Sequence, residues 1–229
     1  MSTPKYNYTF FRIPKDDTIP TSAQNYKQLR LHALSIAPTS FSSTHQIEST
    51  LPDTEWTHRL AAPNIETFIC AATPSNPDEE ATIWIGQLTL RGPLRHEEFI
   101  LPDESGQPNP SARSNIPREL WQMLSLFTLP EHRGQGLGKR LCREALDYLF
   151  SDRRGKKGGG SPEVWVRLMV KPENHATVRL YRGLGFENVG VCTLAEALVA
   201  NGDEHLLPKD TSGEKYTTRS GLIMLLKDY

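Results

Sequence analysis

The sequence predicts an α+β fold, in which strands and amphipathic helices alternate along a chain of 229 residues. Residues 164–170 alternate between aliphatic and other side chains, which is typical of a strand with a buried face. Residues 137–149 repeat leucine and alanine at helical spacing, with charged residues mostly between them. A glycine-rich turn joins another strand pattern to this helix, so we expect a sheet covered by helices.

The N-terminal part of the chain predicts a strand, a helix and a pair of strands, in that order. Residues 8–13 alternate aromatic and polar side chains and form the first strand. A helix follows, for which Thr21 or Ser22 is the expected N-cap and Pro38 the end. Its apolar face carries Tyr26, Leu29, Ala33, Leu34 and Ala37. Residues 67–72 and 82–90 then predict two strands of a hairpin.

The middle of the chain predicts an anion-binding turn between a strand and a helix. The strand pattern of residues 123–129 ends at Pro130, and glycines alternate at positions 134, 136 and 138. Without Cβ atoms the backbone turns sharply, so that successive N–H groups converge on an anion. The positive end of the following helix dipole adds to this attraction. We therefore expect a pyrophosphate to bind here.

Two other interpretations of this turn are considered. Dinucleotide-binding folds also place glycines between a strand and a helix, but in the order Gly-x-Gly-x-x-Gly and with an acidic residue about 20 positions later. The order here is Gly-x-Gly-x-Gly, past the middle of the chain, and the Walker lysine pattern is absent. The second interpretation is a turn that joins strand to helix without binding anything.

The C-terminal part predicts a strand at 164–170, then a helix capped by Asn174 and ended by a left-handed glycine at Gly183 or Gly185. Residues 189–194 predict a strand or turn, residues 195–200 a short helix and residues 222–226 the last strand.

Composition narrows the class of protein. The net charge of −1 and the pI near 6.7 do not favour a nucleic acid or membrane partner. The three cysteines are far apart, without metal-ligand spacing, so we expect no metal, a reducing compartment and buried thiols. No signal-peptide or membrane-spanning pattern is seen, which favours a cytoplasmic protein and leaves a nuclear one open.

The whole chain, 1–229, is expected to be one domain with three flexible insertions. These are 91–117, rich in proline, serine and asparagine, the basic and glycine-rich 152–162, and the polar 201–219. The basic cluster in the second insertion is expected to be solvated, or alternatively to meet a phosphate or an acidic partner.

Two motifs together resemble the GNAT N-acetyltransferase superfamily. The first is Arg133-x-x-Gly136-x-Gly138, the acetyl-CoA signature. The second is the run that begins at Asn174 and includes Ala176, Leu180, Tyr181, Gly185 and Phe186. The resemblance implies a single mixed, mostly antiparallel sheet flanked by helices. It also implies that acetyl-CoA, the co-substrate, lies in the cleft where the central strands splay.

The same resemblance implies roles for individual residues. Backbone groups of Leu126, Phe127 and Thr128 would bind pantetheine and the acetyl oxygen. Asn174 would contact the pantetheine or phosphate arm, and Tyr181 would protonate the leaving thiolate. The turn residues that would hold the pyrophosphate are Arg133, Gly134, Gln135, Gly136, Leu137, Gly138 and Lys139.

The acceptor side resembles a GNAT subgroup in which a glutamate and a tryptophan lie in a second short helix. The matching residues are Arg30, Ala33, Leu34, Pro38, Phe41, Glu48 and Trp56. Arg30, Phe41 and Glu48 are candidate substrate-binding residues, although charges on a helix are usually only solvated. Glu119 is the candidate catalytic base, with Gln122 beside it and Glu48 as the other carboxylate.

The expected function is therefore transfer of an acetyl group from acetyl-CoA to a primary amine of a small molecule, peptide or protein. The protein would be a monomer or a homodimer. Two alternatives are a catalytically weak acyl-CoA-binding module, regulatory or scaffolding, and a nucleotide-binding regulatory domain. Tyr181 argues against the first and the order of the glycines against the second.

Overall fold

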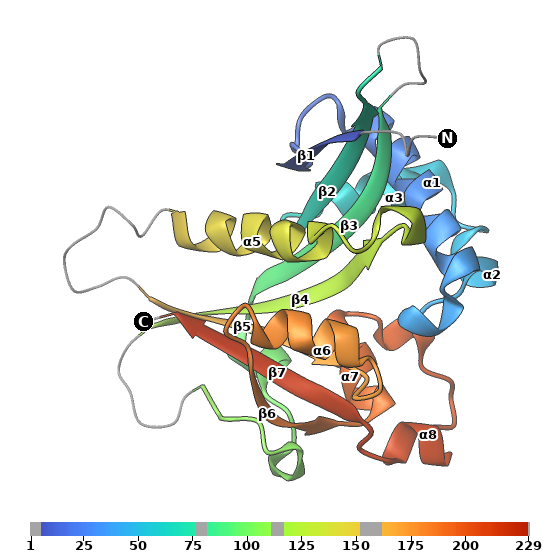
Figure 1. Cartoon of the computed structure of the whole chain (residues 1–229). Coiled ribbons are helices and arrows are strands. Elements are labelled where there is room, and N and C mark those ends of the chain that lie inside the picture. The colour runs from blue at the N-terminus through green and yellow to red at the C-terminus, as the bar shows by residue number, and fades with distance from the viewer. Residues whose placement is uncertain (1–5, 77–81, 111–116, 152–161, 229) are drawn as a thin grey trace. The chain divides into compact units, whose positions relative to one another are not determined.

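The computed structural model describes residues 6–76, 82–110, 117–151 and 162–228. Within these residues the strands form one seven-stranded sheet in the order β1-β2-β3-β4-β5-β7-β6 (Figure 1). The pairs β1–β2, β5–β7 and β6–β7 are antiparallel, whereas β4–β5 is parallel. The predicted α+β fold with a mixed, mostly antiparallel sheet and flanking helices is confirmed.

The chain divides into two compact units. The first comprises residues 1–89 and 125–148, and the second residues 90–124 and 149–229. The elements that begin in the first unit are β1 (Tyr6–Arg12), α1 (Ile19–Ile36), α2 (His45–Glu48), α3 (Asp53–Ala61), β2 (Ile65–Pro74), β3 (Ile83–Leu94) and α5 (Leu137–Phe150). Those that begin in the second are α4 (His96–Phe99), β4 (Arg118–Thr128), β5 (Glu163–Val170), α6 (His175–Arg182), β6 (Glu187–Cys192), α7 (Leu194–Asn201), α8 (Glu214–Thr217) and β7 (Gly221–Asp228). The expectation of a single domain stays a prediction.

In the first unit, helices α1 and α3 pack against each other through aromatic side chains. Trp56 of α3 is fully buried, and its ring lies 6.1 Å from that of Tyr26 on α1. The predicted caps of α1, Thr21 and Ser22, are wrong, because the helix already begins at Ile19. Proline fits the first helical turn, where no intrahelical N–H bond is lost, so Pro20 allows this earlier start.

The acceptor-side helices also differ from expectation. The predicted second short helix is two helices, with Glu48 at the end of α2 and Trp56 inside α3. Pro52 lies between them at the N-cap of α3, and the residue before a proline is disfavoured in helical conformation.

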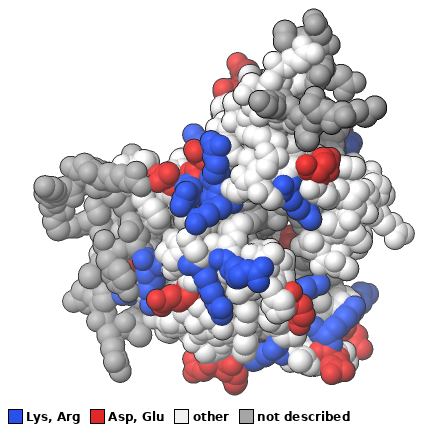
Figure 2. All heavy atoms as spheres, viewed as in Figure 1, with Lys and Arg blue, Asp and Glu red and all other residues white. Residues whose placement is uncertain are grey.

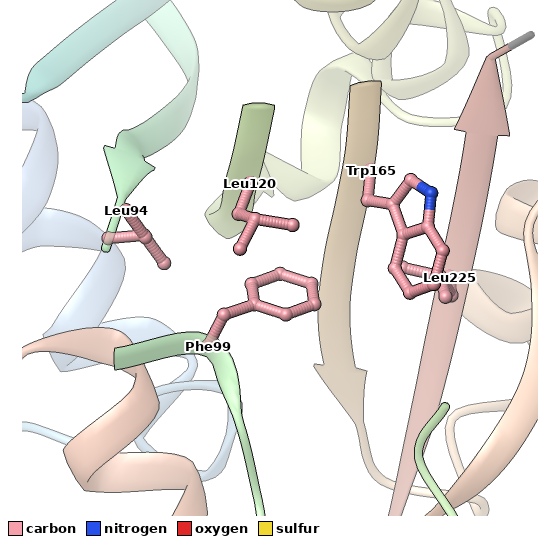
Figure 3. Close-up of a cluster of buried hydrophobic side chains, with 5 residues drawn as sticks. All are labelled: Leu94, Phe99, Leu120, Trp165 and Leu225. Carbon is pink, nitrogen blue, oxygen red and sulfur yellow. The ribbon is translucent and has the colours of Figure 1, made fainter. Parts of the chain in front are cut away.

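In the second unit, a hydrophobic cluster joins four strands to α4. It consists of Leu94, Phe99, Leu120, Trp165 and Leu225 (Figure 3). Phe99 is fully buried there, although sequence analysis places it in an insertion. The expected boundaries of that insertion are therefore wrong: residues 91–94 continue β3, and α4 follows at once.

The remaining parts of the three predicted insertions are either outside the described residues or partly helical. Residues 111–116 and 152–161 lie outside the described residues. The segment 201–219 contains α8 and a 3-10 turn, Glu204–Leu206. Its flexibility stays a prediction.

The burial of the cysteines and the distribution of surface charge agree with what the composition predicts. All three cysteines are free and buried, as expected, and burial raises the pKa of Cys70 and Cys142 to about 12. Basic and acidic side chains are interspersed on the face shown in Figure 2, in keeping with the small net charge. None of the helices in the described ranges is long and apolar enough to cross a membrane.

Candidate active-site residues

The glycine turn of the first unit has the backbone geometry of an anion-binding site. Strand β4 ends at Thr128 and a 3-10 turn, Pro130–His132, leads into the glycines. Gly134 and Gly136 have φ values of 80° and 73°, a left-handed conformation that L side chains rarely adopt. A Cβ atom at either glycine would meet nothing within 4 Å, so the space beside both glycines is open.

The backbone N–H groups of this turn are available to a ligand. Within the part of the chain that the structure describes, the N–H groups of residues 134–139 donate no hydrogen bond to the protein. The first one that does is Arg140 N–H, which donates to the carbonyl oxygen of Gly136 at 3.0 Å. Free N–H groups at a helix start and a glycine turn together favour a bound anion. This is the arrangement that the sequence predicts for a pyrophosphate.

The side chain of Arg133 is folded back onto strand β4. Its Nε donates to the carbonyl oxygen of Thr128 at 3.0 Å, and its guanidinium lies 5.5 Å from the ring centroid of Phe127. In this conformation the side chain of Arg133 ties the turn to the end of β4, and its expected role in cofactor binding stays a prediction.

Strand β4 has an unusual backbone conformation next to the predicted cofactor-binding residues. Ser125, directly before Leu126, has φ 59°, a left-handed value that is uncommon outside glycine. The fully buried side chain of Gln87 donates to the Ser125 carbonyl oxygen at 3.4 Å. Such backbone strain often lies at functional sites, so this bend marks residues 125–128 as a site candidate.

The pairing of β4 with β5 is short. The parallel register joins Arg118–Gln122 to Glu163–Arg167, and β4 continues to Thr128 with no paired residue of β5 among the described pairs. The backbone of residues 126–128 is therefore outside this ladder.

The predicted substrate-binding residues lie together in the first unit. Arg30 donates to both carboxylate oxygens of Glu48, from Nε at 3.1 Å and from the terminal nitrogen at 2.7 Å. The guanidinium of Arg30 also lies 4.4 Å from the ring centroid of Phe41, which in turn is 5.7 Å from that of Phe127. The structure thus brings a predicted acceptor residue into contact with a predicted cofactor residue.

Glu48 is poorly suited to be the catalytic base. Its exposed fraction is 2%, and Arg59, a second cationic partner, donates a third charged hydrogen bond to it at 3.3 Å. Burial raises the pKa of Glu48. The hydrogen bonds and the charge of Arg30, with smaller effects of Ser43 and Arg59, lower the pKa by more than burial raises it. The pKa is therefore below its ordinary value, and the carboxylate is committed to its cationic partners.

The second unit holds the other motif, at helix α6. Asn174 is the N-cap as predicted, and its side-chain oxygen accepts from Thr177 N–H at 3.3 Å. The NH2 group of this side chain could donate to a ligand while the oxygen caps the helix. Tyr181 is 6% exposed and packs with Phe186 at 5.6 Å between ring centroids. The left-handed glycine after the helix is Gly185, with φ 95°, and not Gly183.

The polar residues at the start of β4 differ in their surroundings. Glu119 is partly exposed and accepts a long hydrogen bond, 3.5 Å, from the indole of Trp121. It belongs to the beginning of the strand, whereas Leu126–Thr128 belong to its end.

Gln122 is fully buried and bonded to Arg167 at 2.6 Å and Asn201 at 2.9 Å. Gln122 therefore has a structural role.

Some residues of the site could not be found by sequence reasoning. The turn residue His132 is buried and hydrogen-bonded to Tyr8 of β1, a partner 124 positions away. Ser125 gives no sequence sign of its positive φ, since serine adopts it only when the surroundings impose it. Among the described residues, no group of His, Cys, Asp and Glu could hold a metal ion.

Comparison with known proteins identifies a family. The sequence model described as "Acetyltransferase (GNAT) family" matches residues 72–186, a range that contains both motifs. The N-alpha-acetyltransferase RimI of Mycobacterium tuberculosis is 39% identical over 62 residues, which are 27% of this chain and 32% of that protein. The chain thus matches about a third of the length of this relative.

Solved structures share the fold at low sequence identity. A GNAT-family acetyltransferase from Streptococcus pneumoniae matches with a TM-score of 0.54 and 14% identity, covering 96% of this chain and 99% of the other. Arabidopsis thaliana NAA60 in complex with acetyl-CoA matches with a TM-score of 0.55 and 16% identity, covering 96% of this chain and 98% of the other.

Proposed function

Because the chain belongs to the GNAT family of acetyltransferases, we propose that it transfers an acetyl group from acetyl-CoA to a primary amine. The observation that carries this proposal is the row of available N–H groups at residues 134–139, directly after β4 and at the start of α5. It lies inside the matched family segment, and a related fold is known with acetyl-CoA bound.

In the proposed reaction, the amine nitrogen attacks the thioester carbonyl carbon. A carbon–nitrogen bond forms, the carbon–sulfur bond breaks, and CoA leaves as a thiolate that takes up a proton. The amine loses one proton to a base or to water. Because the thioester is already activated, most of the rate would come from orienting the two substrates. The backbone of residues 126–128 and the turn 133–139 would provide that orientation, and Asn174 would contact the pantetheine or phosphate arm.

Tyr181 is the proposed acid that protonates the thiolate. Its burial at the end of α6 is consistent with a fixed hydroxyl position, and it occupies the tyrosine position of the second motif.

Glu119 is the carboxylate proposed for removal of the amine proton, since Glu48 is held in charged pairs. Replacement of Glu119 by Gln should then lower the rate most at low pH, where fewer amine groups are deprotonated. A pH–rate profile of Glu119→Gln that is parallel to that of the wild type would remove Glu119 from this role and favour a water relay.

The acceptor is proposed to be an α-amine of a peptide or protein, or a small amine. The name of the mycobacterial relative, N-alpha-acetyltransferase, supports the first class. An α-amine has a pKa near 8, so that it needs less help in losing its proton than a lysine amine near 10.4. Phe41, partly exposed and tilted against the ring of Phe127, is the proposed contact for the acceptor side chain, with Arg30 over its ring and Glu48 bonded to Arg30.

The test is release of free thiol from acetyl-CoA by the purified chain in the presence of pooled acceptors. One pool carries peptides with free α-amines, a second carries peptides with blocked N-termini and internal lysines, and a third carries small amines. Thiol release that depends on one pool supports the proposal and names the acceptor class. Tight CoA binding without release in any pool would favour the non-catalytic acyl-CoA-binding module.

A further inference from the structure

A hydrogen-bonded bridge ties strand β1 to the glycine turn. The hydroxyl of Tyr8 lies 3.1 Å from Nδ1 of His132, and Nε2 of Gln135 donates to the same hydroxyl at 3.0 Å. His132 and Gln135 stand on either side of Gly134, whose φ is 80°. A single hydroxyl group is therefore bonded to both flanks of the first bend of the turn.

The bridge is directional. Because Gln135 donates to the oxygen of Tyr8, the hydroxyl proton of Tyr8 is available for Nδ1 of His132, which accepts it in the tautomer that carries its proton on Nε2. The imidazole of His132 is only 4% exposed, and its ring is 5.0 Å from that of Tyr6 in an edge-on contact. Packing thus fixes the ring to which the hydroxyl bonds.

The two sides of the bridge differ in stiffness. Strand β1 pairs with β2 over its whole length, including Tyr8 with Ala72, so Tyr8 is held by a ladder of backbone hydrogen bonds. The turn contains three glycines, which lose more conformational freedom on ordering than other residues do. If a ligand had to order the turn on binding, the lost conformational entropy of the glycines would make the binding free energy less favourable.

We propose that Tyr8 is a positioning residue that holds the turn 133–139 in its anion-binding conformation, through His132 and Gln135. The proposal rests on the proposed function, since CoA is taken as the ligand of the turn. Tyr8 bonds only to the side chains of His132 and Gln135 in the turn and not to the groups proposed to react. It should therefore affect the affinity for CoA and not the rate of the chemical step.

The test compares Tyr8→Phe with the wild type by calorimetric titration of CoA into the full chain. This substitution keeps the ring and removes only the hydroxyl. Loss of two ordinary hydrogen bonds should raise the Kd for CoA about tenfold. The KM for acetyl-CoA should rise by a similar factor, while kcat at saturating acetyl-CoA stays unchanged.

Tyr6→Phe is the matched control. Tyr6 contacts the same imidazole through its ring, and no hydrogen bond of its hydroxyl is found in the described part of the chain. Its CoA affinity should equal that of the wild type. An equal loss of affinity in both variants would assign the effect to general weakening of β1 and overturn the proposal.

A second substitution, Gln135→Met, tests whether Tyr8 acts through the turn. Gln135 is exposed, so this variant should fold even if Tyr8→Phe does not. It should weaken CoA binding, and Tyr8→Phe should cost less affinity in its background than in the wild type. Unchanged affinity of Gln135→Met, or fully additive losses, would contradict the bridge.

The outcomes separate this proposal from the proposed function. A wild-type chain that does not bind CoA would overturn both. A wild-type chain that binds CoA only as tightly as Tyr8→Phe does would overturn the positioning role of Tyr8 and leave the proposed function standing.

Discussion

Tyr181 carries the most specific chemical prediction for a single side chain. Replacement by Phe keeps the ring packed on Phe186 and removes only the hydroxyl. If Tyr181 protonates the thiolate, kcat should fall about 10²-fold, the low end of the range for acid–base groups. The Kd for acetyl-CoA should stay within about twofold, since the residues proposed to hold the pyrophosphate are others.

The measurement is single-turnover acetyl transfer with a saturating acceptor, together with calorimetric titration of acetyl-CoA. Phe186→Leu is the control for packing, because it disturbs the same ring contact and leaves the hydroxyl in place. An unchanged rate constant in Tyr181→Phe would remove Tyr181 as the acid.

Glu48 and Arg30 carry a prediction about stability and pH. Both are almost fully buried, so removal of the Glu48 charge leaves the buried guanidinium of Arg30 without its carboxylate partner. Glu48→Gln should lower the free energy of unfolding by about 3 kcal/mol at pH 7. Because the pKa of Glu48 is lowered in the folded state, its contribution is complete above about pH 4.3 and is lost as pH falls through the folded pKa.

Urea denaturation of the wild type and Glu48→Gln at pH 7 and at decreasing pH checks this expectation. The difference between the two proteins should shrink on acidification below the ordinary carboxyl pKa. A difference that is constant over this range would show that the ionised form of Glu48 is not what stabilises the fold. Asp53→Asn, at an exposed carboxylate paired with Lys27, serves as the comparison.

At the residue scale, sequence predicts local roles but not distant pairs. Asn174 as a helix cap depends only on residues that follow it, and the structure confirms it. The sequence suggests Arg30 and Glu48 as charges that face substrate or solvent. They instead bond to each other because α2 returns to α1, a contact that no local pattern encodes.

At the scale of the element, a substitution in the glycine turn before α5 is the most direct test of CoA binding. A Cβ atom added at Gly136 would meet nothing within 4 Å, so Gly136→Glu should be accommodated apart from a local φ penalty of about 1 kcal/mol. The new carboxylate would lie at the N–H groups that are proposed to hold the pyrophosphate. We expect CoA binding to become undetectable.

Gly213→Glu is the matched control for that substitution. Gly213 also has nothing within 4 Å of an added Cβ, but it lies before α8 with a negative φ. Calorimetry should show wild-type CoA affinity for Gly213→Glu and none for Gly136→Glu. Retained affinity in Gly136→Glu would mean that the turn is not the pyrophosphate site.

The elements with strong periodicity are predictable, and the weakly patterned segment before β4 is not. Helix α4 has four residues, so that it offers no full period to recognise. What holds the segment is Arg167, fully buried on β5, which donates to the Phe99 carbonyl oxygen and to Gln107 Oε1. Burial lowers the pKa of Arg167 to about 9, with smaller effects of Cys192, which raises it, and Arg91, which lowers it. A long-range partner of this kind leaves no sign in the segment's own sequence.

At the scale of the whole molecule, the structure confirms the fold that the sequence predicts, whereas the cofactor site and the acceptor stay predictions. The strand–turn–helix signature and the Asn174 motif, which are proposed to bind acetyl-CoA, both lie within the segment that matches the family model. Acceptor choice is proposed to depend on side chains such as Phe41, whose surroundings come from tertiary packing. One fold serves many acceptors, so this choice has to be measured.

The most direct test of the account is to follow acetyl-CoA and one peptide together. A peptide with a free α-amine and no lysine is incubated with the chain, and released thiol and acetylated peptide are quantified at each time point. We predict equal molar amounts of both, and no release when the same peptide has a blocked N-terminus. Thiol release without acetylated product, or CoA binding without any release across all amine acceptors, would contradict acetyl transfer as the function of this chain.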